Sequence, residues 1–176
     1  MAKVKISELA PGFTLRGVDG KTQGLGDYKD KKAIAVVFSC NHCPTVKDYE
    51  DRMIQIQKDY MNRGVVLVAI NPNDSAKYPA DSFDNMVVRA REKHFNFPYL
   101  RDEDQSVARA YGAERTPEVF LIDSRGVLRY HGRIDDNTDP RNIKSPDLRN
   151  ALDALLAGRP ISVFETEPHG CTVKWR

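Results

Sequence analysis

The sequence predicts a single α/β domain with a mixed central β-sheet flanked by helices. Two short apolar runs, residues 33–38 and 65–70, are rich in β-branched side chains and are typical of strands buried on both faces of a parallel sheet. Apolar runs on both sides of the turn-rich residues 123–126 predict an antiparallel hairpin, which makes the sheet mixed. Because 176 residues suffice for one core of ordinary size, we expect one domain over residues 1–176.

The first half of the chain supplies a hairpin, the two buried strands and the helix between them. Residues 13–18 and 21–25 flank the turn pair Asp19-Gly20, which favours a short hairpin at the start of the domain. We expect Gly64 to end the helix between the buried strands. That helix is predicted by side chains spaced three or four residues apart: Val46, Tyr49, Met53, Ile56 and Tyr60.

The middle of the chain adds two helices that should cover the sheet. One helix is predicted to begin with Asp81 or Ser82 as its cap. The apolar side chains on one face of this helix are Phe83, Met86, Val87 and Ala90. A shorter helix is predicted over residues 104–111, with Gly112 ending it.

The last third of the chain contains the predicted hairpin and one more helix. The hairpin strands are residues 119–122 and 127–130. The helix is expected to begin with Ser145 as cap and Pro146 at the first helical position, and to end at Gly158. The apolar side chains on one face of this helix are Leu148, Leu152 and Leu155.

Residues 159–176 carry prolines and no clear period. We expect this segment to be an extended tail that packs on the domain through Phe164 and Trp175.

Charge and hydropathy exclude several classes of partner. The 27 basic and 25 acidic residues give a net charge of only +2, so no large field recruits nucleic acid or anionic membrane. No run approaches the roughly 20 apolar residues that a membrane span needs, and the start of the chain lacks an apolar signal segment. Three cysteines suit a reducing compartment better than a secreted disulfide scaffold. We therefore expect a soluble, cytoplasmic protein that binds neither nucleic acid nor membrane.

The chemistry is predicted at the sequence Cys40-Asn41-His42-Cys43, which follows a buried strand and opens a helix. Backbone N–H groups at a helix start stabilise an anion, so the pKa of Cys40 is expected to lie below the free-thiol value of about 8.5. Cys40 would then be the nucleophile and Cys43 the resolving thiol. A protonated His42 would stabilise the Cys40 thiolate further and make the disulfide more oxidising. Alternatively, His42 is a solvated residue without a special role.

A zinc site is the competing interpretation of the same cysteines. Cys40 and Cys43 would form half of it, and His169 with Cys171 would complete a Cys3His set. Structural zinc pairs usually lie in loops rather than between a strand and a helix, so we expect neither a metal nor a cofactor.

The chain resembles the thioredoxin-like superfamily, specifically the redoxin branch that holds alkyl hydroperoxide reductase and thiol-specific antioxidant (peroxiredoxin) relatives. The resemblance rests on the 33–38 strand, the cysteine pair, an inserted segment between Asn71 and Leu100, and Thr116-Pro117. Residues 132–137 and 170–175 are most similar to a peroxiredoxin-like subgroup. The resemblance implies a cis bond before Pro117 and makes Thr116 and Pro117 contacts for the backbone of an extended substrate.

Several positions depart from the family pattern. The tryptophan and the buried aspartate that thioredoxin places ahead of its first active cysteine are replaced here by Ser39 and Ile34. Glu118 is either a replacement acid or base facing the thiols or, as an ordinary strand residue, faces solvent. The peroxiredoxin proline and threonine or serine are missing ahead of both Cys40 and Cys43, so the sequence does not predict efficient peroxidase chemistry.

The leading hypothesis is a thiol-disulfide oxidoreductase with an antioxidant or redox-homeostasis role and a couple less reducing than thioredoxin's, about −270 mV. Its partners would be a protein disulfide or thiol and an external thiol reductant. The alternatives are a peroxidase, in which a hydroperoxide converts Cys40 to a sulfenic acid, and a zinc-stabilised binding module.

The roles of four further residues remain open in these hypotheses. Cys171 is either an extra resolving thiol that reaches Cys40 when the tail folds over the site, or a buried inert residue. Arg133, with Asp135 and Asp136, either shapes the site entrance or belongs to a solvated charged loop.

Overall fold

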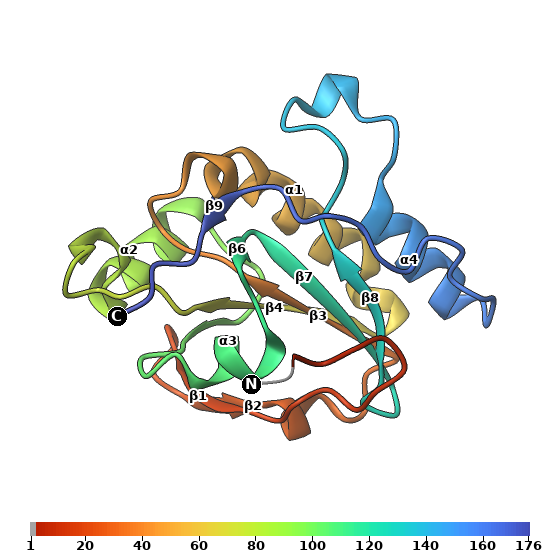
Figure 1. Cartoon of the computed structure of the whole chain (residues 1–176), viewed down its shortest axis with the longest axis horizontal. Helices are drawn as coiled ribbons and strands as arrows, with labels where there is room; N and C mark the ends of the chain where they lie inside the picture. Colours follow the sequence, from red (N-terminus) through yellow and green to blue (C-terminus); the bar gives the residue numbers. More distant parts are fainter. Residues whose placement is uncertain (1–2) are drawn as a thin grey trace.

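The computed structural model describes residues 3–176 and shows a layered α/β fold (Figure 1). The strands are β1 (Thr14–Gly17), β2 (Thr22–Gly24), β3 (Ala33–Phe38), β4 (Val65–Asn71), β5 (Tyr99–Arg101), β6 (Arg115–Thr116), β7 (Glu118–Asp123), β8 (Leu128–Gly132) and β9 (Cys171–Thr172). The α-helices are α1 (Pro44–Tyr60), α2 (Phe83–Lys93), α3 (Ser106–Tyr111) and α4 (Asp147–Leu156). Short 3-10 helices are η1 (Leu25–Tyr28), η2 (Met61–Arg63), η3 (Pro79–Asp81) and η4 (Pro140–Asn142).

Seven strands form one mixed sheet in the order β2-β1-β5-β4-β3-β7-β8. β3 pairs in parallel with β4, β4 pairs in parallel with β5, and the remaining neighbours are antiparallel. All residues of β3 are buried, as the apolar run predicts. The predicted hairpins and the mixed sheet are therefore confirmed.

The helices divide between the two faces of the sheet. Side chains of α1, α2 and α4 share one apolar cluster with the sheet, whereas α3 and the segment around Phe13 and Tyr28 pack in the other cluster. Covering both faces leaves the central strands fully buried.

Helix α1 begins directly at the cysteine motif. Cys43 is its N-cap residue and Pro44 follows at the first helical position, where a missing N–H group costs nothing. After α1, η2 leads to Gly64, whose φ of 80° is the left-handed conformation typical of a helix end. The predicted helix and its end are confirmed.

Of two other predicted helix starts, that of α2 is confirmed and that of α4 differs slightly. Ser82, not Asp81, caps α2, and its side chain accepts the N–H of Asn85 at 3.2 Å. Helix α4 begins at Asp147, and Pro146, expected as the first helical residue, is its N-cap. The cap of α2 is thus one of the two residues expected, and the start of α4 is displaced by one residue.

The tail folds back along the domain, but one predicted anchor is wrong. Phe164 is 51% exposed, so its side chain does not anchor the tail, although its carbonyl oxygen accepts the His131 N–H at 3.0 Å. Trp175 packs against the second apolar cluster, as predicted. Within residues 3–176, no helix is long and apolar enough to cross a membrane.

Candidate active site

Both cysteines of the motif lie at the end of the central strand β3. Cys40 and Cys43 are each 1% exposed, in the loop that leads from β3 into α1. Asn41 holds this loop in place, because its N–H donates to Asp81 Oδ1 at 2.7 Å and its side-chain oxygen accepts the Tyr99 hydroxyl at 2.7 Å. The loop is thus fixed by two buried groups from other elements.

The structure contains a disulfide bond between Cys43 and Cys171, which are 128 residues apart and have Cα atoms 6.2 Å apart. Cys40 is a free thiol. The expectation that Cys171 reaches Cys40 is therefore wrong in this form, because Cys171 is bonded to Cys43 instead. The alternative of an inert Cys171 is also wrong, since the residue is bonded and only partly buried.

The peptide bond between Thr116 and Pro117 is cis, as the family resemblance implies. Thr116 touches both cysteines of the motif: its Oγ1 lies 3.6 Å from Cys40 Sγ, and its carbonyl oxygen lies 3.6 Å from Cys43 Sγ. In this form the backbone of Thr116 pairs with Cys171 of β9. The role of Thr116 and Pro117 in holding an external substrate stays a prediction.

The pKa of Cys40 is raised to about 11, contrary to the sequence-based expectation. Burial is the main cause, and the negative charge of Asp81 adds to it; hydrogen bonds from Thr116 and from backbone groups act in the opposite direction but are outweighed. The helix start alone therefore does not make Cys40 an exposed thiolate in the Cys43–Cys171 form.

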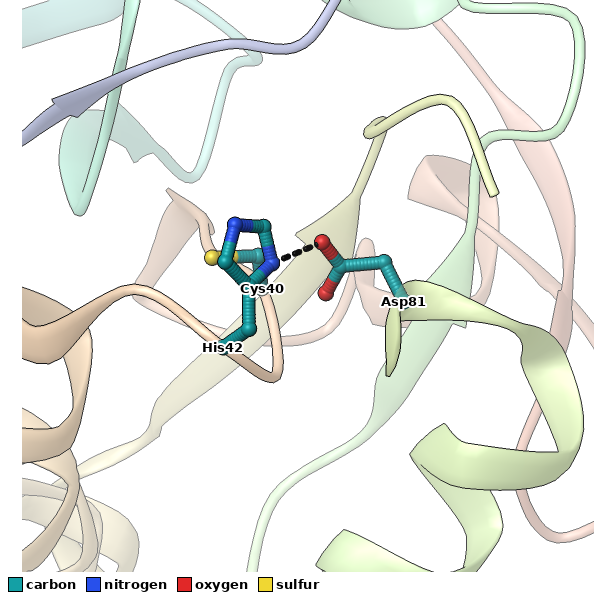
Figure 2. Close-up of side chains that lie close together, drawn as sticks. All are labelled: Cys40, His42 and Asp81. Atoms are coloured by element: carbon teal, nitrogen blue, oxygen red, sulfur yellow. Dashed lines mark hydrogen bonds and ion pairs between the residues drawn. The ribbon is translucent and has the colours of Figure 1, made fainter. Parts of the chain in front are cut away.

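His42 is oriented by a buried carboxylate. Its Nδ1 pairs with Asp81 Oδ2, as Figure 2 shows, and its ring stacks on Tyr78 with centroids 5.6 Å apart. Asp81 is fully buried and also accepts the Asn73 side-chain amide at 3.0 Å. Because a carboxylate only accepts hydrogen bonds, Nδ1 is the donor in this pair, and Nε2 takes no part in it. His42 is thus not merely a solvated residue.

Asp81 is the site residue that sequence reasoning missed. Cys40, His42 and Asp81 each offer a ligand-type atom within 4.8 Å of the others. The sequence showed Asp81 only as a candidate helix cap, and its approach to His42 depends on how the inserted segment folds back over 39 residues.

The same three residues offer a thiol, an imidazole and a carboxylate, which are metal-ligand types. However, both Asp81 oxygens already accept hydrogen bonds, which favours a role in holding His42. Cys43 and Cys171 share a disulfide, so they do not supply thiolates to the Cys3His set considered with His169. That zinc interpretation is wrong for this form.

Glu118 neither faces solvent nor contacts the thiols. It is 1% exposed, and its Oε2 pairs with His131 Nε2 at 2.6 Å. Its Oε1 accepts the N–H groups of Glu114 and Arg115 at 2.8 and 2.9 Å. Glu118 therefore organises the chain just ahead of the cis peptide, with His131 as a partner that sequence reasoning missed.

Arg133 and its acidic neighbours form ion pairs and caps around α4 and α1. Arg133 Nε bonds Asp147 Oδ2 at 2.7 Å, and Asp135 bonds Arg52 Nη1 at 2.8 Å. Asp136 accepts the backbone N–H of Ser145 at 3.0 Å. These contacts give the loop a structural role, so a role at the site entrance stays a prediction.

A cysteine pair between a central strand and a helix, beside a cis-proline, defines the class of thioredoxin-like redox proteins. Within that class, the sequence model of the Redoxin family matches residues 5–152, and the chain belongs to this family. Two solved structures resemble almost the whole chain. A hypothetical protein of Sinorhizobium meliloti is 34% identical with a TM-score of 0.93, covering 99% of this chain and 97% of that one. An uncharacterised conserved protein of Geobacillus kaustophilus is 41% identical with a TM-score of 0.92, covering 98% and 93%.

Curated relatives carry redox activities. The thiol-disulfide oxidoreductase ResA of Bacillus subtilis is 31% identical over 68% of this chain and 62% of its own length. Chloroplastic peroxiredoxin Q of Triticum aestivum is 23% identical over 73% of this chain and 58% of its own length. The chain thus spans about three fifths of the length of these two relatives. Together with the family membership, they support a redox function.

Proposed function

We propose that the protein is a thiol-disulfide oxidoreductase in which Cys40 attacks the substrate and Cys43 resolves the mixed disulfide. The observation that carries the proposal is the contact of both cysteine sulfurs with one residue, Thr116, next to the cis peptide. Two thiols at the end of one strand can reduce a substrate disulfide in two successive thiol-disulfide exchanges. ResA, a relative with this activity in its name, supports the same reaction class.

The exchange begins from the reduced protein. The Cys40 thiolate attacks one sulfur of a substrate disulfide, a bond forms between Cys40 and that sulfur, and the other substrate sulfur leaves as a thiolate that takes up a proton. Cys43 then attacks Cys40 Sγ, forms the Cys40–Cys43 disulfide and releases the second substrate thiol. The substrate gains two electrons and two protons, which the protein loses.

His42 is the proposed proton acceptor for Cys40. In the Cys43–Cys171 form, burial raises the pKa of Cys40 to about 11, and a thiol that stays as buried in the reduced protein needs a base close by to lose its proton. In the His42 ring, Nδ1 is paired with Asp81, so Nε2 is the nitrogen that would take the proton. Asp81 would stabilise the imidazolium that forms when His42 takes the proton.

Peroxide reduction is the second candidate, and the similarity to peroxiredoxin Q is what favours it. In that reaction Cys40 would attack a hydroperoxide, release water or an alcohol, and become a sulfenic acid that Cys43 condenses with. The absence of the peroxiredoxin proline and threonine or serine ahead of both Cys40 and Cys43 argues against rapid attack on peroxide.

One pair of single-turnover rates separates the two candidates. The reduced protein is mixed with hydrogen peroxide in one experiment and with a disulfide-bonded peptide in another. We expect rapid exchange with the peptide and a peroxide rate near that of an ordinary thiol. A peroxide rate far above that of a free thiol, with slow exchange, would reverse the assignment.

The Cys40→Ser variant is the control for the assignment of the nucleophile. It should lose disulfide exchange, and retained exchange would overturn the role of Cys40. An external thiol reductant must return the oxidised protein to its starting state. A cytoplasmic location and an antioxidant role stay predictions.

A further inference from the structure

The C-terminal segment lies on the strand edge that the family resemblance assigns to substrate. Strand β9 pairs antiparallel with β6, with Cys171 opposite Thr116, and the two lie side by side in Figure 1. Val173 extends this pairing, because its N–H donates to the Glu114 carbonyl oxygen at 2.9 Å. An extended peptide adds to an exposed sheet edge by backbone pairing of this kind. The protein's own tail therefore occupies the place of an external peptide.

Gly170 fits the tail closely onto the cis peptide. A Cβ atom at this position would lie 2.1 Å from the Thr116 carbonyl oxygen and 3.1 Å from the Pro117 nitrogen. Backbone atoms cannot be approached that closely without a shift, so a larger residue would lift the tail. Arg115 adds a side-chain hydrogen bond to the Gly170 carbonyl oxygen at 3.1 Å. The sequence next to Cys171 is thus suited to this edge.

Residues beyond β9 fasten the tail to the body of the domain. The Lys174 carbonyl oxygen accepts the Asp74 N–H at 2.8 Å and the Gln105 side-chain amide at 2.9 Å. The Trp175 ring lies under the Arg109 guanidinium, 4.5 Å from its centroid. None of these contacts involves a cysteine, so they hold Cys171 close to Cys43 when the disulfide is reduced, at a high effective concentration.

Exposure distinguishes Cys171 from the other cysteines. Cys40 and Cys43 are each 1% exposed, whereas Cys171 is partly exposed. A thiol in solution reduces a disulfide by attacking a sulfur that it can reach. In the Cys43–Cys171 bond, that sulfur belongs to Cys171.

We propose that Cys171 is a third redox cysteine and that its strand is a built-in substrate mimic, which takes over the disulfide from the Cys40–Cys43 pair. This inference rests on the proposed function. The Cys171 thiolate attacks Cys43 Sγ, the Cys43–Cys171 bond forms, and the Cys40–Cys43 bond breaks. Cys40 leaves as a thiolate and takes up the proton that Cys171 gave up, so the exchange needs no further oxidant or reductant.

An external dithiol then closes the cycle at the exposed side. One of its thiolates attacks Cys171 Sγ, and Cys43 leaves as a thiolate and is protonated. The second thiol of the reductant attacks the mixed disulfide, releases Cys171 as a thiol and leaves as a disulfide. The reductant loses two electrons and the protein regains all three thiols.

Disulfide mapping after one turnover tests the inference. The reduced protein is mixed with one equivalent of a disulfide-bonded peptide, quenched with acid, labelled with N-ethylmaleimide and digested for mass spectrometry. We expect Cys43–Cys171 with a labelled Cys40 in the wild type, and Cys40–Cys43 in the Cys171→Ser variant. Wild-type protein that ends as Cys40–Cys43 would overturn the inference. If the wild type leaves the peptide oxidised, the proposed function itself fails, so the two failures are distinguishable.

A glycine variant tests the substrate-mimic fit with all three cysteines in place. Gly170→Ala should lift β9 and raise the ratio of Cys40–Cys43 to Cys43–Cys171 by about tenfold or more, since small displacements of reacting groups have large effects. Gly26→Ala is the matched control, because a Cβ there meets nothing within 4 Å. An unchanged ratio in Gly170→Ala would contradict the inference.

Re-reduction gives a separate readout of the exposed sulfur. Dithiothreitol should reduce oxidised Cys171→Ser more slowly than the oxidised wild type, because the variant's disulfide lies between two buried cysteines. Equal rates would show that Cys171 is not the point of attack.

Discussion

Asp81 fixes the ring of His42 from a helix turn that lies 39 residues further along the chain. The carboxylate is fully buried and is itself held by Asn41 and Asn73. It lies near Cys40 as well, so one buried charge acts on both the thiol and the imidazole. Figure 2 shows the three side chains together.

Removing the charge of Asp81 should lower the pKa of Cys40. The negative charge disfavours a second anion nearby, so Asp81→Asn should move the pKa from about 11 toward the free-thiol value. Thiolate absorbance, followed against pH in the oxidised protein, measures this. Asp84→Asn, an exposed change on α2, is the control. An unchanged pKa in Asp81→Asn would show that the carboxylate does not act on the thiol.

Removing the Thr116 hydroxyl should have the opposite effect. The hydroxyl lowers the pKa of Cys40 by hydrogen bonding to its sulfur, 3.6 Å away. Thr116→Val has nearly the same shape and no hydroxyl, so the pKa should rise above about 11. The same absorbance titration applies, and a fall in the pKa would contradict the assigned contact.

Replacing His42 should slow disulfide exchange near neutral pH. Loss of a general base costs about 10²-fold, so His42→Gln should reduce the rate of Cys40 attack by that order. The deficit should shrink as the pH rises towards the pKa of Cys40 in the reduced protein, because the thiol then ionises without help. Stopped-flow rates of disulfide exchange, measured from about pH 6 to about pH 10, check this prediction.

His94→Asn is the matched histidine control, because Asn accepts the left-handed conformation that His94 adopts after α2. It should leave the rate unchanged. A deficit in His42→Gln that is the same at every pH would contradict the role of His42 as a base.

His131 should stabilise the fold in a pH-dependent way. Burial by itself lowers the pKa of His131, but hydrogen bonds and charges from Glu118 and Glu165 outweigh it, so the folded-state pKa is raised. A raised pKa stabilises the fold fully below the unfolded-state value of about 6.5, and this contribution is lost as the pH rises through the folded-state pKa. Unfolding free energies of His131→Gln and the wild type should therefore differ most in acid.

The expected cost of His131→Gln at low pH is about 3 kcal/mol, because Glu118 loses its buried partner. Glu165 is 56% exposed, so Glu165→Gln should cost less than about 1 kcal/mol. Urea unfolding at several pH values checks both. A loss in His131→Gln that grows with pH would contradict the assignment.

The sequence predicted the elements whose burial leaves a local pattern. Strand β3 was predicted from a continuous apolar run, as expected for a strand buried on both faces. Helix α1 was predicted from buried residues that recur every three or four positions. The cysteine pair is a short motif, and the cis bond before Pro117 was implied by the family resemblance. Motifs of this kind need no knowledge of distant contacts.

Contacts across the chain were not predictable in the same way. Glu118 was expected to face either the thiols or solvent, but it is buried against His131, whose N–H donates to the Phe164 carbonyl oxygen of the tail. Cys171 was placed near the thiols, yet spacing alone does not say which cysteine it meets. The raised pKa of Cys40 likewise depends on burial and on Asp81, which only the fold brings together.

The central claim is that Cys40 is the thiol that attacks a disulfide. The most direct test uses a Cys43→Ser, Cys171→Ser double variant, in which no thiol remains to resolve an adduct at Cys40. After mixing with a disulfide-bonded peptide, mass spectrometry measures the mixed disulfide and its rate of formation. The account predicts a peptide adduct on Cys40 that forms faster than on a free thiol such as glutathione. An adduct no faster than on glutathione, or none, would contradict it.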